Sequence, residues 1–432
     1  MGVMILDEQL LRMFVYGNSE KYSVLKDVLS AHLKSESDKS AALGHIDRAV
    51  KEILCLSEQF GFCGNLWKCF LSYLLIEDEN PYTLSLEMRK EGESPVKSVA
   101  VSDLRKMYKL FFYDFKPLEK CLGERFFSYF ENTDFSDEKI GGRNNIGRIV
   151  SAFAKSLNQA ENEEDFISVT EAFYRANGVG KFAFSKAFRL AEGADFAQVI
   201  PIYDMKDVGF NDLWGYEYQK SRIIANTQGF VNSKQANNVL LYGDAGTGKS
   251  TMIKAVLNEF YSSGLRMVEV YKHQFKQLSS LIQQMKSRNY YFIIYMDDLS
   301  FEDFEIEYKY LKAVIEGGLE EKPKNILIYA TSNRRHLIKE TWNDRSDMDS
   351  DLHRSDTMSE KLSLADRFGL SINFSKPNQN DYFSIVTHLA RKNSIDMDEK
   401  MLLDGARQWE LSHSGRSGRT AQQYINHLLS SK

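Results

Sequence analysis

The sequence predicts a mainly α-helical N-terminal domain, then an α/β domain with a five-stranded parallel sheet, and finally a small helical lid. Three observations predict this fold class. Before residue 200, apolar residues recur at spacings of three and four, which is typical of helices. After it, short apolar runs alternate with helical patterns, as in parallel sheets wrapped by helices. The last stretch is helical only. We therefore expect domains at 1–200, 201–376 and 377–432.

Length and composition agree with a globular protein of several domains. A chain of 432 residues corresponds to two or three domains at roughly 150 residues each. Its 55 basic and 60 acidic residues give a net charge of −5, which argues against a surface coated in basic residues for nucleic acid. A local DNA contact around Lys322–Lys324 or Arg334–Arg335 stays open, although such pairs are usually solvated.

The N-terminus lacks the pattern of a secretory or membrane segment. Asp7 and Glu8 lie where a signal peptide needs an unbroken apolar core. The longest apolar runs of the chain are far shorter than a membrane span. These observations predict a cytoplasmic protein without membrane association.

The predicted N-terminal domain is unusually aromatic, most of all in the stretch FFYDFKPLEKCLGERFFSYF at 111–130. We interpret this stretch as part of a helical core filled by Phe and Tyr, with a partner-binding groove as the alternative. Gly and Pro residues at 191–217 break the helical pattern and predict a linker. The five predicted strands that follow cover residues 239–242, 266–271, 291–296, 325–331 and 370–374.

The first of these strands leads into a glycine-rich loop that matches the phosphate-binding pattern G-x-x-x-x-G-K-[ST] in full. Its glycines let the backbone turn tightly and aim N–H groups at phosphate oxygens, and the following helix adds its positive dipole end. We expect Lys249 to reach the β- and γ-phosphates and the Ser250 hydroxyl to bind Mg²⁺. A coincidental glycine turn is the alternative. The predicted nucleotide-binding residues of the loop are Gly243, Asp244, Ala245, Gly246, Thr247, Gly248, Lys249, Ser250 and Thr251.

Two later strand ends carry further candidates. The run YYFIIYMDDLS delivers Asp297 and Asp298 at the end of a buried strand. We expect Asp297 to hold Mg²⁺ together with Ser250, and Asp298 to polarise the attacking water. Asn333, after the next strand, could hydrogen-bond the γ-phosphate or position that water. The alternatives are a strand that ends at a turn and an ordinary turn Asn, since Asn is common there.

Two arginines complete the set of candidates. Arg367 precedes the fifth strand, and we expect it to face outward as an arginine finger for the nucleotide of a neighbouring subunit. A surface salt bridge with Asp366 is the alternative. Arg419 stands at the start of a lid helix, where it could contact the γ-phosphate and couple it to the lid angle. The alternative for Arg419 is a solvated side chain at a helix start.

In this order, the glycine-rich loop, the Asp-Asp pair, the strand-end Asn, the DRFG segment and the lid Arg resemble the motifs of AAA+ ATPases, over about 205–432. LWGYEYQKSRIIANTQGF, NNVLLYGDAGTGKSTMIKAVLNEF and EKLSLADRFGL resemble more closely the bacterial ATP-binding family catalogued as domain of unknown function 815, near the clade of replication initiators and helicase loaders. The resemblance implies a P-loop AAA+ core with ATP and Mg²⁺ as ligands. It also implies that Leu213 and Gly215 lie near the adenine, and that the chain forms a homo-oligomer, a ring or hexamer.

The resemblance implies an ATPase that hydrolyses ATP in an oligomer to remodel or load an unidentified protein or nucleic-acid client. The alternative is a slow ATP-dependent switch or scaffold whose N-terminal domain holds a partner. One departure favours the switch slightly, because the usual Asp-Glu pair of AAA+ proteins is Asp297-Asp298 here, one methylene shorter. A third class, the small-molecule P-loop kinase, is disfavoured. Such kinases do not need the strand-end Asn, the arginine finger and the lid Arg in this sequence order.

Overall fold

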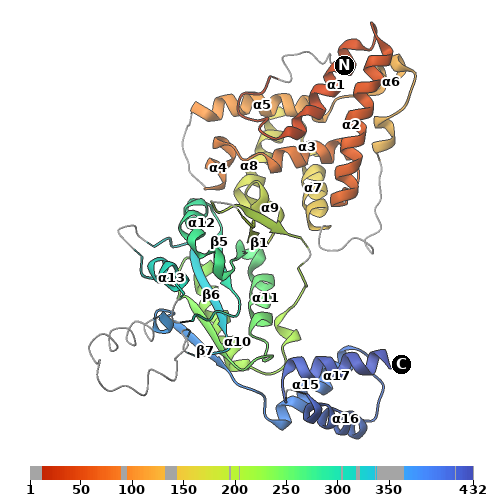
Figure 1. The fold of residues 1–432 in the computed structure, drawn as a ribbon. Helices are drawn as coiled ribbons and strands as arrows, with labels where there is room; N and C mark the ends of the chain where they lie inside the picture. The colour runs from red at the N-terminus through yellow and green to blue at the C-terminus, as the bar shows by residue number, and fades with distance from the viewer. Residues whose placement is uncertain are drawn as a thin grey trace. The chain divides into compact units, whose positions relative to one another are not determined.

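The computed structural model of the protein describes residues 12–88, 95–131, 144–193, 196–203, 205–302, 305–317, 322–335, 337, 364–413 and 415–431. The chain divides into two compact units (Figure 1). Unit 1 comprises residues 1–185 and 201–205, and unit 2 comprises residues 186–200 and 206–432.

Unit 1 is built from helices, as the spacing of its apolar residues predicts. In α2 the Asp38 side chain accepts the N–H of Ala41 over 3.0 Å at the first turn, and Gly61 ends the helix in the left-handed conformation. Ile46 and Ile53 of the same helix are buried. The described helices of unit 1 are η1 (Glu20–Tyr22), α1 (Ser23–Lys34), α2 (Lys39–Phe60), α3 (Leu66–Glu77), α4 (Pro81–Glu87), α5 (Pro95–Phe111), α6 (Lys116–Leu122), η2 (Phe127–Phe130), α7 (Asn144–Leu157), α8 (Glu163–Asn177) and α9 (Lys181–Phe184).

The aromatic stretch of unit 1 lies mostly in its core. Phe115 and Phe127 stack with ring centroids 3.8 Å apart, and Trp67 meets both rings edge-on. The indole N–H of Trp67 donates to Leu110 O over 2.9 Å, so its polar atom is paired although it is buried. Each buried ring of this size stabilises the fold by about 1.5–3 kcal/mol. The prediction of an aromatic helical core is confirmed, with Phe112 and Tyr129 as exposed exceptions.

Two buried carboxylates fix the first described segment of unit 1. Asp103 accepts the backbone N–H groups of Phe14 and Val15, each over 2.8 Å, and Asp78 accepts that of Gly17 over 2.8 Å. Both carboxylates are almost fully buried. Hydrogen bonds to a carboxylate are charge-assisted and stronger than neutral ones, which offsets the cost of burying the two acids.

Six strands and the first two residues of β2 belong to unit 2, in a seven-stranded sheet with the order β2-β1-β4-β5-β6-β3-β7. All five predicted strands form, and each pairs in parallel with its neighbours among them. β3 lies between β6 and β7, so the chain crosses over the sheet through helices. The five strands are β3 (Val239–Gly243), β4 (Leu265–Glu269), β5 (Tyr291–Met296), β6 (Ile326–Ser332) and β7 (Leu370–Phe374).

The two remaining strands were not predicted. β1 (Ala187–Leu190) pairs in parallel with β4, and β2 (Val199–Ile202) forms the edge of the sheet. β2 lies inside the stretch interpreted as a linker, and that interpretation was wrong there. Gly193 lies between the two strands with a φ of 71°, and Pro201 stands in an edge strand, where a missing N–H is tolerated. The Gly and Pro residues thus belong to a turn and an edge strand.

Helices cover the sheet and supply its crossovers. α10 packs against α11 and β7, and α11 packs against β4 and β6. Among the described parts of the chain, no helix is both long enough and apolar enough to cross a membrane. The described helices of the sheet region are η3 (Phe210–Asp212), α10 (Glu217–Val231), α11 (Lys249–Phe260), η4 (Tyr261–Ser263), η5 (Lys272–Gln277), α12 (Leu278–Met285) and α13 (Glu307–Glu316).

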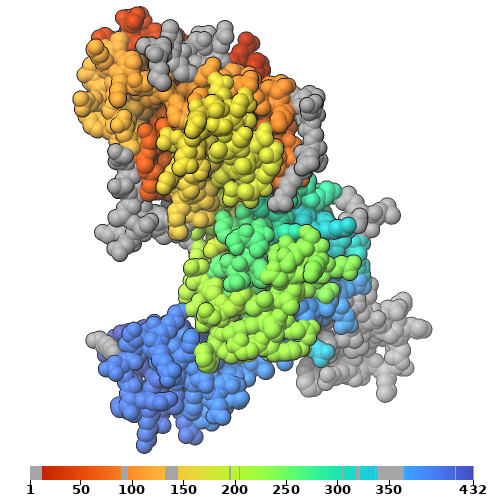
Figure 2. All heavy atoms as spheres, turned by 180° about the vertical axis from the view of Figure 1, so that it is seen from behind, coloured from red at the N-terminus to blue at the C-terminus, as the bar shows by residue number. Residues whose placement is uncertain are grey.

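The last helices of unit 2 form the lid. α15 (Gln379–Lys392), α16 (Glu399–Ser412) and α17 (Gly418–Ser430) enclose a small core that includes the fully buried Val386 and Ile425. Figure 2 shows their atoms, in blue, gathered into one lobe. The predicted fold class is confirmed. The chain has a helical N-terminal unit, a largely parallel sheet that carries the glycine-rich loop, and a helical lid.

Candidate functional site

The glycine-rich loop joins β3 to α11 in a conformation that its glycines allow. Gly243, Gly246 and Gly248 have positive φ values of 129°, 77° and 96°. A Cβ at Gly248 would also lie 2.6 Å from Cδ2 of Leu213, so that this side chain would have to shift. α11 begins at Lys249, so the unpaired N–H groups and the positive dipole end of this helix face the loop. This arrangement is an anion-binding site.

Lys249 lies buried beneath the loop. Its ammonium group donates three hydrogen bonds, to Gly243 O over 2.9 Å, Asp244 O over 2.7 Å and Asn333 Oδ1 over 3.1 Å. Burial lowers the pKa of Lys249, and nearby carboxylates, led by Asp298, oppose the shift. The positive charge is therefore fixed between the loop and the end of β6.

Asp297 and Ser250 meet on the other side of the loop. Ser250 Oγ donates to Asp297 Oδ1 over 2.8 Å, and Thr331 Oγ1, from β6, donates to the same oxygen. Burial raises the pKa of Asp297, but the hydrogen bonds that it accepts, led by that from Thr331, outweigh burial and hold the pKa below its usual value. The carboxylate is therefore ionised at neutral pH.

The Ser250–Asp297 pair fits the demands of Mg²⁺. Among the residues that the structure describes, no group of three or more His, Cys, Asp or Glu side chains could hold a metal ion. Mg²⁺ does not need such a cage, because it is usually bound through one or two protein oxygens together with substrate phosphates and water. A hydroxyl and an ionised carboxylate beside an anion-binding loop supply those oxygens.

Asp298 stands in a strained conformation at the end of β5. Its φ of 49° is rare for a residue other than glycine. Thr331 Oγ1 accepts its N–H over 2.9 Å, and Asn333 Nδ2 donates to its Oδ1 over 2.7 Å. The amide of Asn333 thus joins Lys249 to Asp298, because its oxygen accepts from Lys249 and its nitrogen donates to Asp298. The bond from Asn333 fixes the direction of the Asp298 carboxylate, and the bond to Thr331 fixes its backbone.

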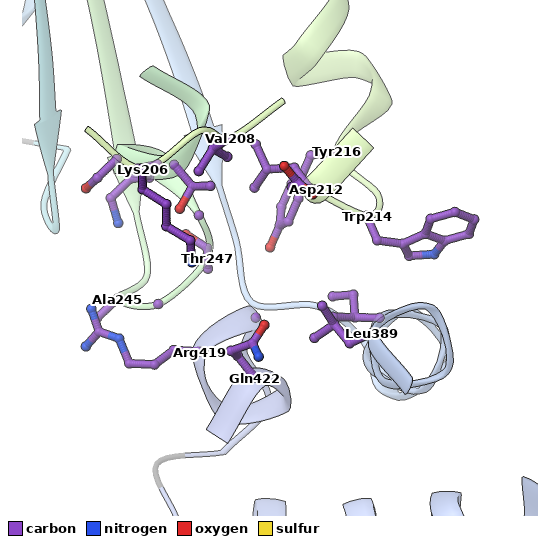
Figure 3. Close-up of a pocket in the computed structure, with 18 of the residues that line it drawn as sticks. Lys206, Val208, Asp212, Trp214, Tyr216, Ala245, Thr247, Leu389, Arg419 and Gln422 are labelled. Atoms are coloured by element: carbon purple, nitrogen blue, oxygen red, sulfur yellow. The ribbon is translucent and has the colours of Figure 1, made fainter. Parts of the chain in front are cut away.

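These groups line one pocket of about 850 Å³, a volume suited to a nucleotide-sized ligand (Figure 3). We name two parts of it. The loop end consists of Ala245, Gly246, Thr247, Gly248, Lys249, Ser250, Thr251, Asp297, Asp298, Thr331 and Asn333. The lid end consists of Lys206, Asp207, Val208, Asp212, Leu213, Trp214, Tyr216, Ile385, His388, Leu389, Lys392 and Asn393. Residues of α17 complete the pocket, namely Gly418, Arg419, Gln422 and Gln423.

The lid end is held together by contacts between the stretch before α10 and the lid helix α15. Trp214 stacks on His388 with ring centroids 4.7 Å apart, and Asp212 forms an ion pair with Lys392. Leu213 is buried in the pocket wall. Apolar and aromatic walls with a few polar groups are the surface that binds a flat heteroaromatic ring.

Arg419 lies at the junction of the lid and the loop. Its backbone N–H donates to Gly246 O over 3.2 Å, and its side chain extends beside Ala245 (Figure 3). Gly246 packs closely against this junction, because a Cβ there would lie 3.0 Å from Ser417 Oγ and 3.2 Å from the Cβ of Arg419. The structure thus brings Arg419 to the same pocket as Lys249.

Four sequence candidates do not line the pocket, namely Gly215, Gly243, Asp244 and Arg367. Gly215 supplies a turn with a φ of 78°, and its neighbours Trp214 and Tyr216 form the wall in its place. Arg367 lies away from the pocket of its own chain, in a turn anchored by the buried side chain of Phe368. The salt-bridge alternative named Asp366 as its partner. In the structure the guanidinium instead forms an ion pair with Glu316, the last residue of α13.

Sequence reasoning missed several residues of this pocket. Thr331 had a usable signal, since it stands two positions before Asn333 at the end of the same strand. Trp214 and Tyr216 flank the predicted Gly215 and could have been found with it. His388 and Lys392 lie in no motif, and only the fold brings them to the pocket.

The chain was compared with curated proteins and with solved structures. Curated proteins give no match to this chain. Among solved structures, a mutant of RuvB from Thermotoga maritima is 12% identical with a TM-score of 0.37, and the match covers 51% of this chain and 65% of that chain, just under two thirds. The FIGL-1 AAA domain in complex with ADP is 15% identical with a TM-score of 0.36, covering 52% of this chain and 74% of that chain.

The family comparison is the decisive one. The family model described as "Protein of unknown function (DUF815)" matches residues 183–432, which is more than half of the chain and includes the whole pocket. The match agrees with the resemblance that the motifs indicate. The chain belongs to the DUF815 family.

Proposed function

We propose that the protein binds ATP together with Mg²⁺ and hydrolyses the ATP, as an AAA+ ATPase. The observation that supports this best is the convergence of Lys249, the Ser250–Asp297 pair, Asp298 and Asn333 on one pocket beside a helix N-terminus. In this proposal the loop and Lys249 bind the β- and γ-phosphates. The adenine occupies the lid end.

The residues of the loop end then have separate roles. Ser250 and Asp297 would hold Mg²⁺, which would supply positive charge to neutralise the phosphates. Asp298 polarises the attacking water and accepts its proton. Asn333 orients Asp298 through the 2.7 Å hydrogen bond and contacts the γ-phosphate or the water. Arg419, on α17, contacts the γ-phosphate from the lid side.

The proposal includes assembly into a homo-oligomer, a ring or hexamer. Arg367 lies outside the pocket of its own chain, so a role in hydrolysis requires that it reach the pocket of a neighbouring subunit. Both partners of its ion pair with Glu316 are partly exposed, so the pair would hold the guanidinium at the surface. Glu316 is the last residue of α13, the helix that follows the strand of Asp297 and Asp298. An arginine finger accelerates hydrolysis by roughly 10³–10⁵.

Steady-state ATP hydrolysis at increasing protein concentration tests this proposal. The specific activity should rise with concentration, because each complete site needs two subunits. The Arg367→Ala variant should bind ATP but turn it over at least about a hundredfold more slowly. Arg391→Ala, an exposed lid arginine outside the pocket, is the matched control and should hydrolyse like the wild type. Concentration-independent activity that Arg367→Ala leaves unchanged would rule out the shared site.

A second candidate is a slow ATP-dependent switch or scaffold. The observation that favours it is the strained, amide-bound state of Asp298, whose carboxylate is one methylene shorter than the usual Glu. Single-turnover hydrolysis distinguishes the two proposals. A rate that no concentration of the protein accelerates supports the switch.

The biological role belongs to the same proposal. The ATPase would remodel or load a protein or nucleic-acid client in the cytoplasm, with unit 1 as the partner-binding part. DNA binding carries no supporting observation beyond the basic pairs of the sequence. Salt-dependent binding to single- and double-stranded DNA would support a loader, and no binding at low salt would exclude one.

A further inference from the structure

We propose that Asp244 is a positioning residue that ties the glycine-rich loop to the hinge of the lid. The hinge is residues 375–378, which join β7 to α15. This inference rests on the proposed binding of a nucleotide in the pocket. It assigns to Asp244 a task other than contact with phosphate.

Asp244 is the second residue of the loop, but its side chain is directed to the hinge. Its Oδ2 accepts the backbone N–H of Lys376 over 2.9 Å, and its own N–H donates to Phe374 O over 3.0 Å. Among the described loop residues that line the pocket, Ala245 is the first. A carboxylate inside the pocket would repel phosphate, so its pairing with the hinge removes a charge conflict from the loop.

The hinge is also held from the side of α10. Tyr216 Oη donates to Ser375 O over 3.0 Å, and Gln219 Nε2 donates to Asn373 O over 3.0 Å. Asp244 and Tyr216 therefore pair with consecutive hinge residues, one through an N–H and the other through a carbonyl. The start of the hinge is fixed to the nucleotide-binding part of unit 2 through these two side chains.

A second contact joins the loop to the far end of the lid. Gly246 O accepts the N–H of Arg419 over 3.2 Å, in the first turn of α17. Two loop residues, Asp244 and Gly246, thus each make one hydrogen bond to the lid, the former at its hinge and the latter at its last helix. A shift of the loop on phosphate binding moves both attachment points together. The lid angle therefore follows the state of the loop.

Hydrogen exchange of the full-length protein, followed by mass spectrometry, tests this inference directly. Peptides that cover 375–378 are compared in the wild type, Asp244→Ala and Asp244→Asn, with and without Mg²⁺ and a non-hydrolysable ATP analogue. We expect Asp244→Ala to speed exchange of the Lys376 amide at least about tenfold, the factor for a lost hydrogen bond to a charged acceptor. Asp244→Asn keeps an acceptor oxygen and should return exchange to within about threefold of the wild type.

Kinetics supply a readout that a purely structural role would not move. Asp244→Ala should lower kcat about tenfold while the KM for ATP changes less than threefold, and Asp244→Asn should restore kcat. Asp404→Ala removes one exposed lid carboxylate outside the pocket and is the control for net charge. If Asp244→Ala does not fold, Asp244→Ser, whose hydroxyl is shorter than the carboxylate, takes its place with the same expected results.

The outcomes separate this inference from the proposed function. If the analogue leaves exchange of residues 243–251 unchanged in the wild type, the proposed nucleotide binding fails, whatever the hinge does. If the analogue protects the loop but Asp244→Ala exchanges at the hinge like the wild type, the inference about Asp244 is overturned. Equal acceleration by the Ala and Asn variants overturns it as well, because the acceptor oxygen would then be irrelevant.

Discussion

The two ends of the pocket are built in different ways. At the loop end, Asp297, Asp298 and Asn333 follow the carboxyl ends of the neighbouring strands β5 and β6, and Lys249 begins the helix after the glycine-rich loop. These residues hydrogen-bond one another or share Thr331. At the lid end, the walls come from the stretch before α10 and from α15, far apart in the sequence. Their contacts are a ring stack and an ion pair.

This difference predicts that substitutions at the two ends affect different steps. The loop end is a connected network, so that removal of one member disturbs the others, and charged groups there act on phosphate. The lid end consists of separable contacts whose effects should be modest and additive. Substitutions at the loop end should therefore mainly change turnover and its pH dependence, and those at the lid end should mainly change affinity for the base.

The largest effect is expected from Asp297→Asn, which removes the ionised partner of Ser250. Turnover should fall about 10²–10³-fold, and more Mg²⁺ should be needed for half-maximal activity, because a neutral amide binds Mg²⁺ more weakly. Asp396→Asn, an exposed lid residue outside the pocket, is the matched control. Steady-state hydrolysis at several Mg²⁺ concentrations measures both quantities. Turnover within tenfold of the wild type would place the metal site elsewhere.

The next effect concerns pH and Thr331. The Thr331 hydroxyl leads the hydrogen bonds that lower the pKa of Asp297, so Thr331→Val should raise this pKa and move the acid limb of the pH–rate profile to higher pH. A depressed pKa stabilises the fold above the unfolded-state value, and this stability is lost as pH falls through the folded value. Thr331→Val should thus also lower the free energy of unfolding at neutral pH by about 1–3 kcal/mol.

Thr331→Ser is the control for this prediction. Serine keeps the hydroxyl that donates to Asp297 and accepts the N–H of Asp298, so its acid limb should coincide with that of the wild type. pH–rate profiles and denaturant unfolding of the three proteins measure both effects. Superimposable acid limbs for Val and Ser would mean that Thr331 does not tune Asp297.

A smaller effect is expected from Trp214→Ala at the lid end. Loss of the stack on His388 and of the apolar wall should weaken ATP binding about tenfold, since such ring contacts contribute about 0.5–1.5 kcal/mol beyond area burial. Binding of inorganic tripolyphosphate, which has no base, should stay unchanged. Tyr310→Ala, an exposed aromatic residue of α13, is the matched control. Equal weakening of both ligands would break the distinction between the two ends.

The smallest effect is expected from Lys392→Ala. The Asp212–Lys392 ion pair is partly exposed to solvent, and pairs of this kind contribute about 0.2–1 kcal/mol. ATP affinity should fall less than about fivefold at low salt, and the difference from the wild type should vanish at high salt. Calorimetric titrations at the two salt concentrations measure it. A large, salt-independent loss would mean that Lys392 contacts the ligand itself.

The sequence could predict the loop end because its geometry is local. A strand, a glycine-rich loop and a helix within 239–260 set the loop, and strand ends set Asp297, Asp298 and Asn333. All five predicted strands were confirmed. The apolar runs of β3, β4, β5 and β6 are largely buried on both faces, whereas β7 alternates buried and exposed residues.

The lid end and the hinge depend on tertiary contacts and could not be predicted. His388 and Lys392 are polar residues of an amphipathic helix, so the sequence alone suggests that they face solvent. Only the packing of α15 against the stretch that carries Trp214 brings them to the pocket. β1 and β2 are four residues each and too short to produce a periodic signal. Asp244 was predicted to bind the nucleotide with the rest of the loop, because no local pattern shows that its carboxylate pairs with Lys376.

The proposed ATP site is tested most directly by calorimetric titration of Mg²⁺ and ATP into the wild type, Lys249→Ala and Lys254→Ala. Lys254 is an exposed lysine of the same helix α11 and lies outside the pocket, so it controls for the lost charge. We predict one site per chain in the wild type and in Lys254→Ala, with affinity lost at least about a hundredfold in Lys249→Ala. Equal binding by Lys249→Ala and the wild type, or no binding by the wild type, would contradict the proposed site.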